Sequence, residues 1–186
     1  MRAAARAVTL DRAEALQLVG SFDPGANEKV RASAQRTQEL LDRVEAPFTR
    51  TTFDPGHVTA SALVLTPDAG SVLLVYHERL ERWLQPGGHL EPSDRSLMDA
   101  ARREVLEETG IELGSAAATL VSLDVHEIPA ARGEPSHFHH DFMFRFRLDR
   151  DASPAPGPRV VWCPLAQLSR YGVDGPLLRG VERALS

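Results

Sequence analysis

Three glutamates, Glu104, Glu107 and Glu108, stand at i, i+3 and i+4 in a segment whose apolar residues recur with helical spacing. On an ideal helix these positions neighbour one another on one surface. Two of them, Glu104 and Glu108, fall on the apolar stripe of Ala101 and Val105, which should face the protein. Partly buried carboxylates that repel each other need a compensating charge, and hard divalent cations such as Mg²⁺ or Mn²⁺ suit oxygen ligands. A charged amphipathic helix without a ligand is the simpler alternative.

The residues around the glutamates predict how they are positioned. Gly87 and Gly88 form a turn before the helix, and glycine lets the backbone approach a ligand closely. Ser96 and Asp99 have the spacing of a helix-capping box, and Gly110 is a typical stop signal. We therefore expect a helix over residues 97–109, preceded by the glycine turn and ended at Gly110.

The whole stretch from Gly88 to Ile111 resembles the Nudix box, Gly-x5-Glu-x7-Arg-Glu-U-x-Glu-Glu-x-Gly-U, in which U is a bulky aliphatic residue. Residues 103–111, read as REVLEETGI, agree with the second half at every specified position. The first half departs twice, because Asp94 stands where the family has glutamate and eight residues rather than seven separate Asp94 from Arg103. A loop absorbs one residue without changing the helix register, so only the role of Asp94 stays open.

The resemblance implies an α/β fold, with a mixed β-sheet sandwiched between helices and here an N-terminal helical extension. It also implies a Mg²⁺-dependent pyrophosphohydrolase that cleaves a nucleoside diphosphate linked to another moiety, as in a nucleotide sugar, a dinucleotide or a nucleoside triphosphate. Glu104, Glu107 and Glu108 would hold Mg²⁺, or Mn²⁺, with the backbone carbonyl of Gly87. Arg103 would orient the carboxylates. The metal would activate water for attack at phosphorus, and a carboxylate that we do not assign would accept the proton.

Two other functions are compatible with this fold. A non-catalytic sensor of a nucleotide metabolite would often lack box carboxylates, whereas this chain keeps all three in the helix. An enzyme resembling isopentenyl diphosphate isomerase would need a catalytic cysteine near the sheet. Cys163 lies late in the chain, in an apolar strand where a thiol stays protonated, which disfavours that function.

A second polar group alternates along the segment 137–148. His137, His139 and Asp141 project to one side of the expected strand, with Arg145 further along the same face. These side chains could converge on a phosphate or a metal, and we take them as candidate substrate-binding residues. The simpler alternative is a row of surface polar groups. Two more histidines are weaker candidates: His57 and His89.

The composition points to a small substrate rather than a polymer. The chain has 186 residues and a net charge of −5 without a long basic run, which argues against polymeric nucleic acid as a partner and leaves a small-molecule diphosphate. One cysteine cannot form an internal disulfide, and no apolar run is long enough for a signal peptide or a membrane span. We therefore expect a cytoplasmic protein without a membrane partner, and a homodimer is compatible with the sequence.

The elements divide the chain into a helical extension at 1–50 and a Nudix domain at 51–186. Helices are expected at about 11–19 and 27–44, and they could pack on the main domain, form a dimer contact or cover the site. In the domain, strands are expected at 58–66, 71–76, 117–127, 137–148 and 160–165, and helices at 97–109 and 176–185.

Overall fold

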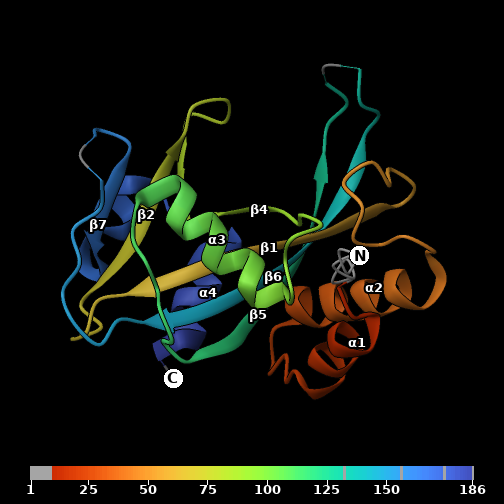
Figure 1. Ribbon diagram of the computed structural model, residues 1–186, viewed down its shortest axis with the longest axis horizontal. Coiled ribbons are helices and arrows are strands. Elements are labelled where there is room, and N and C mark those ends of the chain that lie inside the picture. The colour runs from red at the N-terminus through yellow and green to blue at the C-terminus, as the bar shows by residue number, and fades with distance from the viewer. Residues whose placement is uncertain (1–9, 132, 156, 174, 186) are drawn as a thin grey trace, which may run out of the picture.

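The computed structural model describes residues 10–131, 133–155, 157–173 and 175–185 (Figure 1). Its helices are α1 (Arg12–Ser21), α2 (Glu28–Arg43), α3 (Leu97–Thr109) and α4 (Gly175–Leu185), with a 3₁₀ helix η1 (Leu165–Tyr171). Its strands are β1 (Gly56–Leu65), β2 (Ser71–His77), β3 (Arg82–Leu84), β4 (Gly87–His89), β5 (Ala118–Ile128), β6 (His137–Arg147) and β7 (Val160–Pro164). None of the described helices is long and apolar enough to cross a membrane.

The strands form one mixed sheet around β1. The main path runs β3-β2-β1-β6-β5, while β4 also pairs with β1 and β7 with β2. β1 runs parallel to β6 along its whole length, from Gly56 opposite Phe138 to Leu65 opposite Arg147, and the other pairs are antiparallel. Every residue of β1 is buried, as its nearly continuous apolar sequence predicts for a strand covered on both faces.

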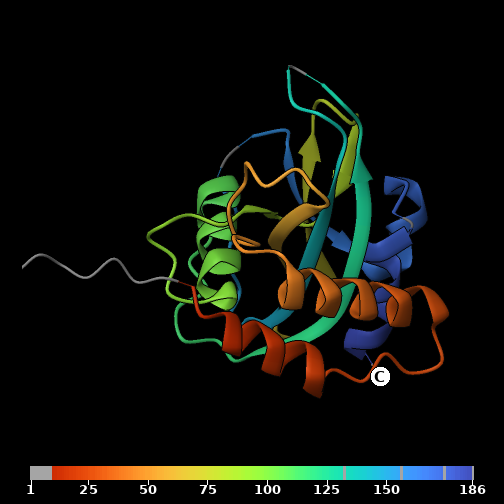
Figure 2. The ribbon, with the colours of Figure 1, turned by 90° about the vertical axis from the view of Figure 1, so that its right-hand side faces the viewer.

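Alternate residues of β1 contribute to two separate cores. The even-numbered residues from Val58 to Val64 pack with the phenylalanines of β6 and the apolar side of α3. Leu63 and Leu65 point the other way and pack beneath η1 and α4. Figure 2 shows α3 and α4 on opposite sides of the sheet. The side on which a residue of β1 lies therefore decides which helix it meets.

The N-terminal helices pack on the same core as α3. Ala15 of α1 and Leu41 of α2 are fully buried in the cluster that contains β1. α2 also lies along the outer edge of β5, where the Ser33 hydroxyl accepts the N–H of Val125 at 3.1 Å. Packing on the main domain is thus one role of the extension, while the boundary expected at residue 50 stays a prediction.

The expected fold class is confirmed, because a mixed sheet lies between helices and the N-terminal helices are present. The long elements end within two residues of their expected bounds. No sequence pattern indicates β4, because its three residues include two glycines and show no alternation. It forms because it pairs with β1 over Thr59 to Ser61.

Replacing Leu41 by alanine should lower the free energy of unfolding of the whole chain by about 2–5 kcal/mol, because the side chain is fully buried in the shared core. Urea unfolding followed by far-UV circular dichroism and by tryptophan fluorescence should show one transition, and Lys29→Ala on the exposed side of α2 should shift it by under about 0.5 kcal/mol. Two separate transitions would show that the extension folds independently of the sheet.

Candidate functional site

Helix α3 is held in place at both ends. The Ser96 hydroxyl accepts the N–H of Asp99 at 3.0 Å as the N-terminal cap, and Gly110 ends the helix in the left-handed region with φ of 72°. The apolar side of α3 packs on β1, with buried residues that include Leu97 and Val105. The helix therefore turns its charged side toward β4 and the loop that follows it.

Arg103 joins the loop to the acids of the helix. Its Nε and Nη2 donate to the two carboxylate oxygens of Asp94 at 3.0 and 3.1 Å, and its Nη1 donates to Glu104 at 2.9 Å and to Glu107 at 3.1 Å. Nη2 also donates to the backbone carbonyl of His89 at 2.9 Å. Asp94 is only 4% exposed. Asp94, whose role the sequence leaves open, thus pairs with Arg103.

The two glycines of β4 allow close contacts on both sides, Gly88 with Glu104 and Gly87 with β1. A Cβ at position 88 would lie 2.7 Å from Oε1 of Glu104, and a Cβ at position 87 would lie 2.5 Å from the Cβ of Ser61. The backbone N–H of Gly87 donates to Oε2 of Glu108 at 3.1 Å. The structure thus brings both glycines and two of the three glutamates together. The role expected for the Gly87 carbonyl stays a prediction.

The electrostatics of these carboxylates favour a bound cation. Burial raises the pKa of Glu104, and the neighbouring charges of Glu107 and Asp94 add to this, although Arg103 opposes it. Loss of solvation and the charges of Glu104 and Glu107 raise the pKa of Glu108 to about 7, against the hydrogen bond from Gly87. Arg103 alone therefore does not neutralise the acidic cluster, which consists of Asp94, Glu104, Glu107 and Glu108.

The donor set fits Mg²⁺ or Mn²⁺. Glu104, Glu107 and Glu108 offer only oxygen ligands, which hard divalent cations prefer over nitrogen or sulfur. The cluster carries an excess of negative charge, which a divalent ion would offset. Glu104 and Glu107 now share the Nη1 group of Arg103, so the arginine holds both acids toward one place.

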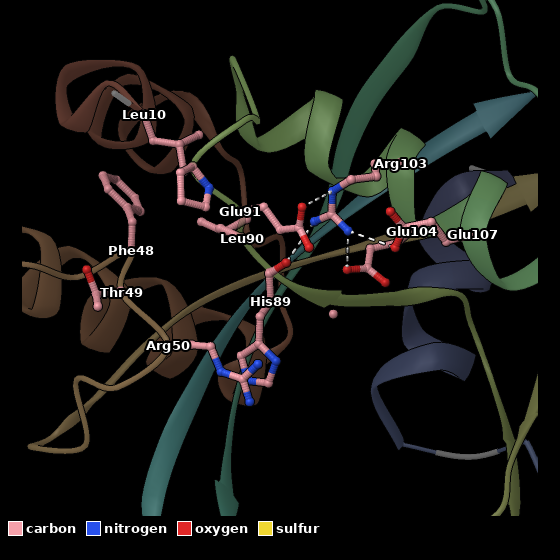
Figure 3. A pocket seen from close by; sticks show the side chains of 12 residues that line it. Leu10, Phe48, Thr49, Arg50, His89, Leu90, Glu91, Arg103, Glu104 and Glu107 are labelled. Carbon is pink, nitrogen blue, oxygen red and sulfur yellow. Dashed lines mark hydrogen bonds and ion pairs between the residues drawn. The ribbon is translucent and has the colours of Figure 1, made fainter. Parts of the chain in front are cut away.

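A cavity of about 810 Å³ adjoins the acids. Figure 3 shows its walls, with α3 on one side and the segment 48–50 on the other. Arg50 supplies a guanidinium on that second wall, and Leu10 and Phe48 bring the N-terminal extension to the site. The lining residues are Leu10, Phe48, Thr49, Arg50, Gly88, His89, Leu90, Glu91, Pro92, Arg103, Glu104 and Glu107. Such a volume accommodates a nucleotide-sized ligand.

The four candidate substrate-binding residues occupy three different places. His137 and His139 lie together with their ring centroids 5.2 Å apart. Asp141 is buried and accepts the hydroxyl hydrogens of Thr59 and Ser61 at 2.9 and 2.5 Å, so it is engaged within the sheet. Arg145 donates to the carbonyl of Ala184 at 2.9 Å, at the end of α4. The alternation along β6 places the four on one face, but it does not bring all of them to one site.

Two residues that the sequence ranks low lie beside His137 and His139. The rings of His57 and His89 are 5.1 Å apart, and each also lies within about 5 Å of the ring of His139. His89 additionally lines the cavity. The sequence ranks these histidines low because the cluster depends on the pairing of β1 with β6. These two strands are far apart in the sequence and run parallel, and no local sequence pattern reveals such a pairing.

Comparisons with known proteins identify the family and the fold of the chain. Residues 55–181 match the NUDIX domain family. None of the curated proteins compared matches the chain. The Ap4A hydrolase of C. elegans is 21% identical with a TM-score of 0.52, over 69% of this chain and 98% of that one. The NUDIX domain of Shewanella oneidensis NrtR, solved with ADP ribose, is 21% identical with a TM-score of 0.55, over 79% and 95%. At this identity, the two structures show a shared fold.

Gly88→Ala should weaken Mn²⁺ binding by roughly tenfold or more, because the added methyl group occupies the place of the Glu104 carboxylate. The domain should stay folded, since the contacted atoms are the far end of a flexible side chain. Isothermal titration calorimetry measures the affinity, with Gly20→Ala as a matched control because a Cβ at position 20 would meet no atom within 4 Å. Unchanged Mn²⁺ affinity in Gly88→Ala would contradict this role of Glu104.

In the metal-free protein, the Glu108 carboxyl should titrate near pH 7 rather than near its ordinary 4.5. The folded chain then binds this proton more tightly than the unfolded chain, so the contribution of Glu108 to stability is full below about pH 4.5 and is lost as the pH rises through about 7. Carboxyl ¹³C NMR measures the titration, and Glu108→Gln identifies the resonance. A midpoint near 4.5 would show that the carboxylate is solvated.

Proposed function

The chain belongs to the Nudix family, and from this premise we propose that it hydrolyses the diphosphate linkage of a nucleoside diphosphate joined to another moiety, with Mg²⁺ or Mn²⁺ as cofactor. The observation that carries the proposal is the under-neutralised set of three glutamates beside a nucleotide-sized cavity. Phosphoric anhydrides are polyanions, so a site with this charge can accept them only together with a cation.

Each residue of the site has a separate part in the proposed reaction. Glu104, Glu107 and Glu108 would hold the divalent ion, which supplies charge neutralisation at the diphosphate and activation of water. Arg103 keeps Glu104 and Glu107 in place through its shared Nη1 group. A water that attacks phosphorus must lose a proton, and one of the three carboxylates would accept it. Arg50, on the opposite wall of the cavity, is placed to pair with a phosphate oxygen.

The cavity and the proteins that share the fold support a proposal for the substrate class. The cavity is large enough for a nucleoside with a second group attached. One neighbour is an Ap4A hydrolase and another binds ADP ribose, and both ligands join nucleoside phosphates to a further moiety. We therefore propose a small nucleotide-derived diphosphate as the substrate, and we place His137 and His139 at the far rim of the site, beside His89.

The two alternatives differ in what they require of this chain. A catalytic cysteine is disfavoured, because Cys163 is buried in the core beneath α4, away from α3, and burial raises the pKa of its thiol. A non-catalytic sensor has no need of three neighbouring glutamates, two of which share one arginine. We also propose that the protein is located in the cytoplasm, a reducing compartment that accords with the free, buried thiol of Cys163.

Glu107→Gln and Glu108→Gln should each lower Mg²⁺-dependent turnover by about a hundredfold or more, because each removes a proposed metal ligand or proton acceptor. Release of nucleoside monophosphate is measured over a panel of ADP ribose, other nucleotide sugars, dinucleoside polyphosphates and nucleoside triphosphates, with Mg²⁺, with Mn²⁺ and with EDTA. Glu112→Gln, an exposed acid just beyond the helix, serves as the matched control.

Unchanged turnover in both glutamine variants would refute the assignment of the metal site. Tight binding of a member of the panel without turnover in the presence of either metal would instead favour the sensor. Thermal unfolding of each variant, compared with that of the wild type, separates loss of chemistry from loss of fold.

A further inference from the structure

Five histidine rings gather on the face of the sheet that points away from α3, and the outermost, His126 of β5, lies 5.6 Å from the ring of His139. In the parallel register His57 stands opposite His139, and His137 lies two residues earlier on the same face of β6. The ring centroids are 4.8 Å apart for His57 and His139, and 5.1 Å apart for His57 and His137. His89 of β4 brings a fourth ring to 5.1 Å from both His57 and His139. Long-range strand pairing thus assembles this cluster.

Three of the rings have the mutual spacing of metal ligands. One ring nitrogen from each of His57, His137 and His139 lies within 4.8 Å of the others. Within the described residues, no other three histidine, cysteine or acidic side chains meet this condition. A tetrahedral ion with metal–nitrogen distances of about 2.0–2.1 Å would bring such nitrogens to about 3.4 Å from one another. A bound ion would therefore draw the three nitrogens closer together than the 4.8 Å within which they lie here.

Backbone carbonyls fix the orientation of two of these rings. Nδ1 of His57 lies 3.0 Å from the carbonyl oxygen of Thr52, and Nδ1 of His137 lies 2.9 Å from that of Pro135. A carbonyl can only accept a hydrogen bond, so each Nδ1 carries the hydrogen, and in a neutral ring Nε2 keeps its lone pair. A histidine that binds a metal through one nitrogen commonly donates the other N–H to a carbonyl in this way.

The lone pairs are buried and are not used by the protein. Within the part of the chain that the structure describes, Nε2 of His57 and Nε2 of His139 are buried and have no hydrogen-bond partner. His57 is 1% exposed and His137 is 4% exposed. Buried polar atoms are nearly always satisfied, because removing them from water without a partner costs free energy. Two such atoms in one cluster point to a ligand.

We propose that His57, His137 and His139 form a second metal site, which takes a borderline transition-metal ion of the Zn²⁺ type rather than Mg²⁺. Imidazole nitrogen binds such ions well, whereas Mg²⁺ prefers carboxylate and water oxygens. His89 is the adjacent ring on the side of the cavity, where the ion would meet a fourth ligand. The site does not depend on the proposed hydrolytic function, because none of its three ligands belongs to the acidic cluster.

The two donor sets are separated by a single strand. Gly88 lies against the carboxylate of Glu104, while the next residue, His89, lies beside the ring of His57. Because alternate residues of a strand point to opposite faces, the acids and the histidines lie on different sides of β4. Zinc bound by the histidines is therefore distinguishable by mutation from zinc bound by the acids.

The direct test is long-range ¹H–¹⁵N NMR of the histidine rings in the wild-type protein, stripped of metals and titrated with Zn²⁺ in excess Mg²⁺. The ring nitrogens of His57, His137 and His139 should shift together and saturate at about one Zn²⁺ per chain. His77 and His140 should keep their shifts, because His77 lies at the end of β2 and the ring of His140 contacts Thr37 on the other face of the sheet. This measurement needs no variant, so a folding defect cannot obscure it.

Variants then assign the ligands. His137→Gln and His139→Gln should weaken Zn²⁺ binding by roughly tenfold to a hundredfold or more, measured by calorimetry in excess Mg²⁺. His77→Gln and Glu107→Gln should bind Zn²⁺ like the wild type, which separates the cluster from a stray histidine and from the acids. No saturable shift in the three rings, or loss of Zn²⁺ binding only in Glu107→Gln, would overturn the proposal.

Discussion

The pairing of β1 with β4 on one edge and with β6 on the other positions both groups of candidate site residues, the glutamates and the histidines. Through β4, it places Gly88 beneath Glu104 on the side of α3. Through β6, it places His139 opposite His57 on the other side. Gly56 allows the close start of this pairing, since a Cβ there would lie 1.9 Å from the carbonyl oxygen of Phe138. A shift of either register by one residue would turn the histidines into the core and separate Gly88 from the glutamate.

The acidic helix could be predicted because its chemistry is local. The spacing of three glutamates, a serine cap and a glycine stop fix the helix and its charged side within a short stretch of chain. The strands could be placed for the same reason, the first two from nearly continuous apolar runs and the strands at 117–127 and 137–148 from their alternation. The match of residues 55–181 to the NUDIX domain family bears out the resemblance that rests on this stretch.

What the sequence could not reveal depends on distant pairing. His137, Asp141 and Arg145 share a face of β6, yet that strand is long enough for its ends to meet different parts of the protein. The carboxylate of Asp141 is taken up by Thr59 and Ser61, and Arg145 reaches α4. The contact between Arg103 and Asp94 likewise depends on how the loop folds back, which a count of residues does not determine.

Successive residues of β4 point to opposite faces of the strand, and this bears on which cations from the medium each face would bind. Gly88 adjoins the carboxylate oxygens of Glu104, and the next residue, His89, adjoins the ring of His57 with its nitrogen donors. Cations that differ in hardness would therefore partition between the two faces by ligand preference, although both faces border one cavity. If both proposed sites bind metal, the two faces of this single strand would select ions by donor atom rather than by size or distance.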